Sequence, residues 1–475
     1  MRKNMKIEQI YTGCLAQGAY YIESNGEAAI IDPLREVQPY IELAEKRNAE
    51  IKYIFETHFH ADFVSGHLTL SEKTGAPIIY GPLADPQFEA LIAEDNQSFP
   101  LGEVTIQVLH TPGHTMESTT YLLLDQDGNP HAIFTGDTLF LGDVGRPDLA
   151  QKAASMTQEE LAGTLYDSLR SKIMTLPAET IVYPGHGAGS ACGKNMSKET
   201  VGTIGDQLKN NYALRADMSR DEFIKEVTDG LLPPPAYFPL NVMLNKKGYQ
   251  DVGEVIKRGS TAMSPTEFEV AANVTGAVVL DVRHQNDFAQ GHIPRSIFIG
   301  INGGFAPWVG ALIKDIEHPI LLVAPEDRLE ETITRLSRVG FDNVIGYLDG
   351  GITNWVASGK EIDQVAGISA EAFAAELKTN RLDVVDVRKQ SEFLSHRLAE
   401  STNIPLVEVN EHLDQFSGDG MTYIHCAGGY RSMIAISILK SRGIHNLIDV
   451  RGGFGAIKNT DAAVTAYVCP STLTV

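Results

Sequence analysis

Two histidines and an aspartate crowd one short turn in the N-terminal part of this 475-residue sequence. His58, His60 and Asp62 follow the apolar run Ile51–Phe55, which has the character of a buried strand. Neutral imidazole and carboxylate groups are the usual protein ligands of zinc and iron. The next residue of the series, Phe63, has no donor atom. The spacing therefore predicts a metal site, and Phe63 bears on how many metal ions it holds.

Three further polar residues lie in short turns downstream. His114 stands in Pro-Gly-His-Thr, Asp137 in Thr-Gly-Asp, and His186 in Pro-Gly-His. Each turn follows a strand-like run, and loops at strand ends commonly carry functional side chains. Taken together, HxHxD, PGHT, TGD and PGH form an ordered series that is far more specific than any one motif.

This series resembles the metallo-β-lactamase superfamily over roughly residues 5–200. The resemblance implies an αβ/βα sandwich with metals at the strand ends. In two-metal members a histidine stands at the place of Phe63 and serves the second metal with Asp62 and His186, while Asp137 bridges. The first metal would take three histidines: His58, His60 and His114. Phe63 removes a ligand from the second site and so disfavours a bridging hydroxide between two metals.

A narrower resemblance is to the persulfide dioxygenases of this superfamily, which carry one Fe(2+) per chain. Their ligands match His58, His114 and Asp137. Two histidines and one carboxylate form a facial triad that leaves open positions for oxygen and substrate. Three nearby groups would then orient the ligands and water instead of binding the metal: His60, Asp62 and His186.

Two other residues bear on substrate. Arg146 matches an arginine that these dioxygenases use near the thiol carrier, and a guanidinium suits a carboxylate or phosphate. Cys192 lies soon after His186 in a small-residue loop. It is either a small loop residue or a thiol at the cleft that accepts or presents sulfur.

A second chemical motif begins at Cys426, after the apolar run Thr422–His425 and before a helical run. Backbone N–H groups and the positive end of a helix dipole favour a thiolate there. The motif resembles the six-residue catalytic loop of the rhodanese family, with Cys426 as nucleophile and Arg431 at its end. The loop residues between them are Ala427, Gly428, Gly429 and Tyr430. A phosphatase of related fold is the competing interpretation, but its loop is one residue longer.

The C-terminal half contains an internal repeat. Val278–Arg283 recurs as Asp383–Arg388, and both units later reach a Gly-Gly pair after a strand. Two rhodanese-like α/β domains of about 100 residues with parallel sheets fit this pattern. In the first unit Ala324, give or take one residue, stands where the second has Cys426. We therefore interpret the first unit as inactive in sulfur transfer.

These patterns predict an α/β multidomain chain. Its predicted parts are a dioxygenase domain at 1–200, a helical and proline-rich crossover at 201–261, an inactive rhodanese-like domain at 262–362 and an active rhodanese domain at 363–475. The formal net charge of −22 argues against nucleic acid and anionic membranes as partners. The sequence has no uninterrupted run of about 18 apolar residues, so it predicts no membrane span. Four scattered cysteines indicate a reducing cytoplasm rather than a disulfide framework.

Sulfur is common to both predicted sites. We expect a dioxygenase that oxidises a low-molecular-weight thiol persulfide to sulfite with O2, coupled to a sulfurtransferase at Cys426 that interconverts sulfite and thiosulfate. Glutathione, coenzyme A and bacillithiol all remain open as the thiol, and a homo-oligomer, dimer or tetramer, is expected. The alternatives are a dinuclear hydrolase resembling glyoxalase II fused to a sulfurtransferase, and a persulfide sensor or carrier without enzymatic activity.

Overall fold

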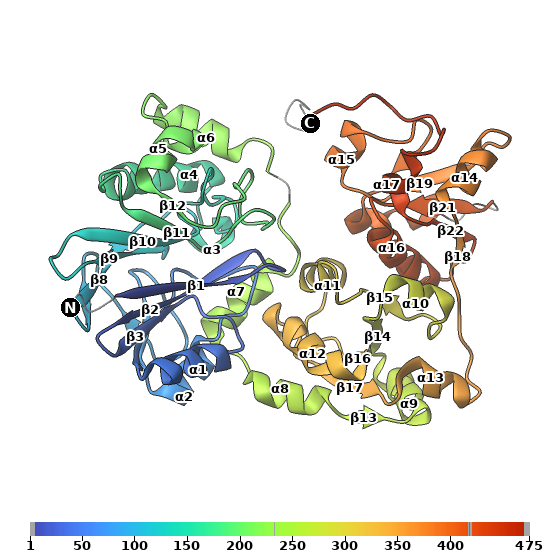
Figure 1. The fold of residues 1–475 in the computed structure, drawn as a ribbon, viewed down its shortest axis with the longest axis horizontal. Helices are drawn as coiled ribbons and strands as arrows, with labels where there is room; N and C mark the ends of the chain where they lie inside the picture. Colours follow the sequence, from blue (N-terminus) through green and yellow to red (C-terminus); the bar gives the residue numbers. More distant parts are fainter. Residues whose placement is uncertain (1–4, 232, 417, 419, 470–475) are drawn as a thin grey trace. The chain divides into compact units, whose positions relative to one another are not determined.

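The computed structural model describes residues 5–231, 233–416, 418 and 420–469. The chain divides into two compact units. The first holds the residues up to Val252 together with Ser337–Gly340, and the second holds Gly253–Leu336 together with the residues from Phe341 onward. Figure 1 shows helices and strands alternating through both units, in agreement with the predicted α/β class.

The first unit is a sandwich of two six-stranded sheets in its described residues. The first sheet follows chain order, with strands β1 (Lys6–Thr12), β2 (Gln17–Ser24), β3 (Glu27–Ile31), β4 (Glu50–Phe55), β5 (Ile78–Tyr80) and β6 (Leu91–Ile92). The second has the order β12-β11-β10-β9-β8-β7, with strands β7 (Ser98–Leu101), β8 (Val104–His110), β9 (Thr119–Leu124), β10 (Pro130–Gly136), β11 (Ile181–Pro184) and β12 (Gly202–Thr203).

Aromatic side chains fill the space between these two sheets. Tyr20 meets Phe134 with ring centroids 5.0 Å apart, and Phe55 meets Tyr121 at 4.7 Å. Helices cover the outer faces (Figure 1), namely α1 (Gln38–Arg47), α2 (His67–Thr74), α3 (Gln151–Ala154), α4 (Gln158–Ser168) with a π-helical turn at Leu169–Ile173, α5 (Ile204–Asn210) and α6 (Arg220–Thr228). The predicted αβ/βα sandwich is therefore confirmed, and its metal-motif turns lie at strand ends.

The crossover after the sandwich is more helical than its proline content indicates. Pro233–Pro235 form no helix, as expected, but α7 (Phe238–Lys247) begins only three residues later and α8 (Val252–Gly259) follows. Pro239 stands in the first turn of α7, where the missing N–H has no intrahelical partner in any case. After the three prolines the crossover thus continues as helices.

The second unit contains two five-stranded parallel sheets in its described residues. The first, in the order β13-β17-β16-β14-β15, is built from β13 (Ala262–Met263), β14 (Val278–Asp281), β15 (Ile297–Phe298), β16 (Ile320–Val323) and β17 (Val344–Leu348). The second, in the order β18-β22-β21-β19-β20, is built from β18 (Ala366–Ile368), β19 (Asp383–Asp386), β20 (Thr402–Asn403), β21 (Thr422–His425) and β22 (Leu447–Val450).

Nine α-helices in the described residues accompany these sheets. They are α9 (Pro265–Thr275), α10 (Gln285–Gln290), α11 (Phe305–Leu312), α12 (Leu329–Arg338), α13 (Gly351–Ala357), α14 (Ala370–Leu377), α15 (Gln390–Ser395), α16 (Tyr430–Ser441) and α17 (Gly453–Ile457). The same strand order in both sheets confirms that the second unit contains two repeats with parallel sheets.

Strand register fixes the alignment of the two repeats. Asp281 pairs with Val323 in the first sheet, and Asp386 pairs with His425 in the second. The residue after each partner is Ala324 in the first repeat and Cys426 in the second. The first repeat therefore carries a methyl group where the second carries a thiol.

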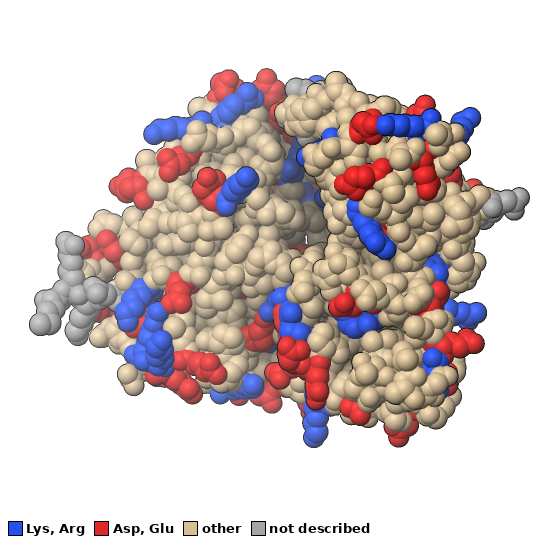
Figure 2. All heavy atoms as spheres, turned by 45° about the vertical axis from the view of Figure 1, so that its right-hand side comes forward, with Lys and Arg blue, Asp and Glu red and all other residues tan. Residues whose placement is uncertain are grey.

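The surface carries both signs of charge. On the face drawn in Figure 2, lysine and arginine side chains lie among aspartate and glutamate side chains. Within the described residues, no helix has the length and apolar character needed to cross a membrane.

Candidate metal centre and cysteine loop

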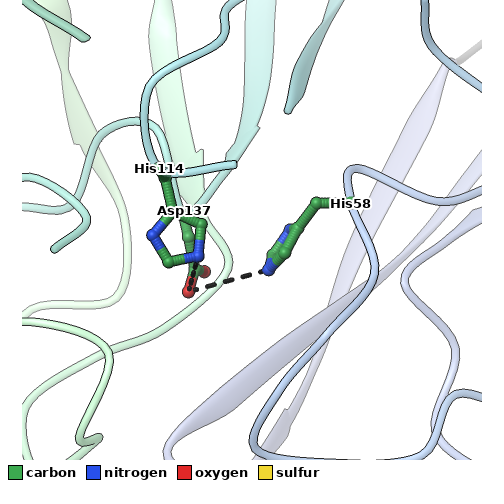
Figure 3. A group of neighbouring side chains, drawn as sticks. All are labelled: His58, His114 and Asp137. Carbon is green, nitrogen blue, oxygen red and sulfur yellow. Dashed lines mark ion pairs between the residues drawn. The ribbon is translucent and has the colours of Figure 1, made fainter. Parts of the chain in front are cut away.

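Three predicted ligands meet at the strand ends of the sandwich. His58 follows β4, His114 follows β8, and Asp137 follows β10. Their ligand atoms all lie within 4.8 Å of one another, and all three side chains are buried. Both imidazoles point their Nε2 atoms at Asp137 Oδ2, at 3.9 Å from His58 and 3.6 Å from His114 (Figure 3). The two halves of the sandwich thus bring together one three-donor cluster.

The outer ring nitrogens determine which tautomer each histidine adopts. The hydroxyl of Thr57 donates to Asp32 Oδ2 at 2.9 Å, so it accepts from His58 Nδ1 at 3.0 Å. His114 Nδ1 lies 2.9 Å from the carbonyl oxygen of Arg146, which can only accept. In both rings the proton is therefore on Nδ1, and the lone pair of Nε2 faces Asp137. This is the arrangement that a metal ligand requires.

The groups around the cluster favour the binding of a cation. Burial, followed by the nearby His60, His114 and His186, lowers the pKa of His58 well below its ordinary value, which favours the neutral imidazole. Among the described residues, neither of the two buried carboxylate oxygens of Asp137 has a hydrogen-bond partner. Buried polar atoms without partners are rare, and a bound ion explains them. The donor set fits a divalent metal such as iron.

A second group adjoins the first. His186 Nε2 lies 3.5 Å from both Asp62 Oδ1 and Asp137 Oδ1, and His60, Asp62 and His186 also have ligand atoms within 4.8 Å of one another. Phe63 is fully buried, and its ring lies 4.3 Å from that of His60. A hydrocarbon ring therefore stands beside this group without offering it a donor atom.

His60 is also engaged on another side by two buried carboxylates. Its Nε2 lies 3.1 Å from Asp32 Oδ1 and 3.3 Å from Glu56 Oε2. Burial alone would lower the pKa of His60, but the two carboxylates outweigh it and raise the pKa well above its ordinary value. Sequence reasoning did not identify Asp32 or Glu56 as site residues, although each stands at or just after the end of a strand.

The turn that carries His58 and His60 is held by a side chain from α7. Asn245 Oδ1 accepts from the backbone N–H of Ser65 at 2.9 Å, and Nδ2 donates to the carbonyls of His60 and Phe63, both at 2.8 Å. Asn245 is almost fully buried. No sequence motif identified it, because its partners lie about 180 positions away.

Arg146 and Cys192 both lie at the edge of the metal cluster. The guanidinium of Arg146 makes two 2.7 Å hydrogen bonds to Asp148, and Nη1 donates to the carbonyl of Ala191 at 3.2 Å. Cys192 is buried, and its sulfur lies within 4.8 Å of ligand atoms of Asp137 and His186. Burial and nearby carboxylates raise the pKa of the Cys192 thiol well above its ordinary value, which favours the protonated thiol.

The second predicted site lies in the second unit, between β21 and α16. The Cys426 side chain is buried, and its sulfur accepts a hydrogen bond from Gly429 N at 3.1 Å. Gly429 has φ +104°, a conformation that other residues rarely adopt, and it brings this N–H toward the sulfur. Arg431 closes the loop but turns to Glu392, which accepts at 2.6 and 2.9 Å.

The turn at Gly452-Gly453 and the residues that follow it hold the cysteine loop through backbone hydrogen bonds. Phe454 N donates to the Cys426 carbonyl at 2.6 Å, and Gly455 N donates to that of Ala427 at 2.9 Å. A Cβ on Gly453 would lie 2.9 Å from the carbonyl carbon of Ala427, and its φ is +56°. The glycine is therefore required by both space and backbone conformation.

Comparison with known proteins agrees with this geometry. The model of the metallo-beta-lactamase superfamily matches residues 12–186, and that of the rhodanese-like domain matches 264–358 and 369–460. The human mitochondrial persulfide dioxygenase ETHE1 is 31% identical over 224 residues, which cover 46% of this chain and 79% of the human protein. The chain belongs to the metallo-β-lactamase superfamily.

Two further proteins are similarly related to this chain. A probable hydroxyacylglutathione hydrolase of Schizosaccharomyces pombe is 33% identical over 167 residues, which span 34% of this chain and 60% of the yeast protein. A crystal structure described as a metallo-beta-lactamase from Staphylococcus aureus superposes with a TM-score of 0.63 at 29% identity. The superposition covers 73% of this chain and 99% of the Staphylococcus aureus chain. The superfamily member described here thus joins a metallo-β-lactamase domain to two rhodanese-like domains.

Proposed function

We propose that this protein is an iron-dependent persulfide dioxygenase fused to a thiosulfate sulfurtransferase. The proposed parts are the dioxygenase domain at 1–200, the crossover at 201–261, the inactive rhodanese-like domain at 262–362 and the active one at 363–475. The observation that carries the proposal is the cluster of His58, His114 and Asp137. Two histidines and one carboxylate are the donor set of mononuclear iron oxygenases.

The proposed first reaction converts R–S–SH, O2 and H2O into R–SH, sulfite and two protons. Fe(2+), one per chain, supplies the redox chemistry that couples dioxygen to oxidation of the outer sulfur. The protein's own part is to hold both imidazoles with Nε2 inward, through Thr57 and the carbonyl of Arg146. His60, Asp62 and His186 are proposed to orient the ligands and water.

The proposed second reaction takes place at Cys426. Its thiolate attacks the outer sulfur of a second R–S–SH, which releases R–SH and leaves Cys426–S–S⁻. Sulfite then attacks this outer sulfur, so that thiosulfate leaves and the thiolate returns. Gly429 N–H supports the anionic sulfur, since it already donates to Sγ. The same steps in reverse would let thiosulfate supply persulfide.

Substrate binding is proposed to involve Arg146. Its guanidinium is held in the bidentate contact with Asp148, a geometry that a carboxylate or phosphate of the thiol carrier reproduces. Glutathione, coenzyme A and bacillithiol each carry such a group. Cys192, at the cluster's edge, is proposed as a thiol that accepts or presents sulfur.

The test combines metal analysis with product analysis on a low-molecular-weight persulfide. His114→Ala should lose iron and dioxygen uptake, whereas His131→Ala, a partly exposed histidine of the same domain, should keep both. Cys426→Ser should keep dioxygen uptake but yield sulfite in place of thiosulfate, and Cys469→Ser, at an exposed cysteine, should behave as wild type. Unchanged thiosulfate formation in Cys426→Ser would defeat the coupled scheme.

The competing function is hydrolysis of a thiolester, as in hydroxyacylglutathione hydrolases. The group of His60, Asp62 and His186 beside the first cluster is the observation that favours it. Hydrolysis of this kind requires a second metal ion, and the Phe63 side chain has no donor atom that could bind one. Two metals per chain together with hydrolysis of a glutathione thiolester would support it over the dioxygenase.

A further inference from the structure

The inactive rhodanese-like domain carries no thiol, yet it contacts the cysteine loop of the active one. Both domains lie within the second unit. The Tyr430 hydroxyl, at the end of the cysteine loop, donates to the carbonyl of Gly300 at 2.6 Å. The Tyr430 ring meets Phe298 edge-on, with centroids 5.8 Å apart. One residue of the loop is therefore anchored in the other domain.

The Tyr430 ring fits against the preceding domain only because glycines line the space that it occupies. A Cβ on Gly303 would lie 2.5 Å from Cε2 and 2.7 Å from Cε1 of that ring, and one on Gly300 would lie 3.2 Å from Cε2. The φ of Gly303 lies outside the left-handed region that favours glycine, so backbone conformation does not by itself require glycine there. Position 303 therefore requires glycine because the Tyr430 ring occupies the space that a side chain there would take.

The anchored ring lies next to the group that contacts sulfur. Tyr430 directly follows Gly429, whose N–H donates to Cys426 Sγ, and it begins α16. The inactive domain holds α16 at a further point, since Phe298 N donates to Ser437 Oγ at 3.0 Å. Anchoring Tyr430 therefore limits how far the adjoining backbone of Gly429, and with it this N–H, can move.

We propose that the inactive domain holds the loop around Cys426 in its reactive shape, with Tyr430 and Gly303 as positioning residues for sulfur transfer. This inference rests on the proposed sulfurtransferase function of Cys426. It gives the first repeat, which has Ala324 at the cysteine position, a role in the reaction of the second.

The test uses the full chain and neighbouring glycines. Gly303→Ala places a methyl group against the Tyr430 ring, whereas Gly304→Ala has its nearest neighbour 3.4 Å away, in Trp308. Gly304 has φ −71°, outside the left-handed region that favours glycine. Sulfur transfer from thiosulfate to a thiol is measured at saturating and limiting thiosulfate, together with dioxygen uptake on a persulfide as a check on the remainder of the protein.

We expect Gly303→Ala to lower kcat of sulfur transfer by about tenfold or more, because small misplacements of reacting groups have effects of this order. KM for thiosulfate and dioxygen uptake should change little, and Gly304→Ala should match wild type. Alkylation of Cys426 by iodoacetamide, followed in its own peptide by mass spectrometry, should slow in Gly303→Ala. Tyr430→Phe, which removes only the hydroxyl, should lower kcat by a smaller factor.

A double variant separates positioning from general damage. If Gly303→Ala acts through the Tyr430 ring, it should have no further effect in a Tyr430→Leu background. Equal rates for Gly303→Ala and Gly304→Ala, or additive losses in the double variant, would overturn the inference while leaving the sulfurtransferase function intact. Full sulfur transfer in Cys426→Ser would instead remove the proposed function itself, and the inference with it.

Discussion

Asn245 donates its side-chain amide to the carbonyl oxygen of Phe63 at 2.8 Å, although 182 positions separate the two residues in sequence. Phe63 is the residue whose lack of a donor atom disfavours a second metal. The same amide group also donates to the carbonyl of His60. A helix of the crossover, outside the part of the chain that matches the superfamily model, thus shapes the turn that carries the proposed metal ligand His58.

Replacing Asn245 by leucine should weaken the metal site. The change leaves three buried backbone groups without a partner, each at a cost of about 1–3 kcal/mol. The turn should then hold His58 less firmly, and we expect metal affinity to fall by about 10–100-fold. Iron retained per chain after dialysis against a chelator measures this. Met243→Ala, at a more exposed position of the same helix, is the control, and equal retention in both variants would contradict the prediction.

Thr57→Val should weaken iron binding while keeping the shape of the side chain. Valine cannot accept from His58 Nδ1 or donate to Asp32, so the tautomer of His58 is no longer fixed. We expect a loss of about 10–100-fold in metal affinity, measured by chelator competition. Thr57→Ser keeps the hydroxyl and should bind iron as wild type does. The idea fails if valine and serine give the same affinity.

Phe63→His should raise the metal content of the protein. An imidazole at this position would add a donor beside His60, Asp62 and His186, and complete the ligand set of a two-metal site. We expect one metal per chain in wild type and a higher value in the variant after reconstitution with excess zinc. Phe63→Leu, which adds no donor, should stay at one. A wild-type content near two would argue for the hydrolase.

The buried carboxyl of Asp449 should make the stability of the second rhodanese-like domain depend on pH. Burial is the main cause that raises the pKa of Asp449 to about 6, from 3.8, although Ser432 donates to it at 2.7 Å. The folded state therefore binds more protons than the unfolded state between these values, so stability falls as pH rises from about 4 to 6 and is level above.

Asp449→Asn removes this ionisation and should stabilise the protein at pH 8 by about 2–3 kcal/mol relative to wild type. The gain should be about 1 kcal/mol smaller at pH 5, where much of the wild-type carboxyl is already protonated when folded. Denaturant unfolding of both proteins at the two pH values measures the difference. A gain that is the same at both pH values would show that Asp449 does not titrate as described.

Removal of the metal should separate the two proposed activities. A chelator that strips iron should abolish dioxygen uptake, because the cluster of His58, His114 and Asp137 is its only proposed site. Sulfur transfer at Cys426 uses no metal and should stay within about twofold of the untreated rate. Loss of both activities on chelation, restored together by iron, would show that the metal also supports the second unit.

The sequence by itself determined which chemical groups are present. The motif series predicted a metal site at strand ends, because strand periodicity and short turns are local properties of the chain. The resemblance that these motifs carry implied the sandwich and the donor set of His58, His114 and Asp137. The repeat likewise predicted a thiol at Cys426 and its absence at Ala324, and strand register confirmed that alignment.

Only the tertiary structure decided how these groups are held. The proton of His58 is fixed by Thr57 and Asp32, the ligand turn by Asn245, and the anchoring of Tyr430 by Gly300 of the preceding domain. Apart from the contact between the neighbours Thr57 and His58, these contacts join residues from 25 to 185 positions apart. These contacts depend on how strands and helices pack. Because packing brings together residues that share no local pattern, no sequence motif predicts them.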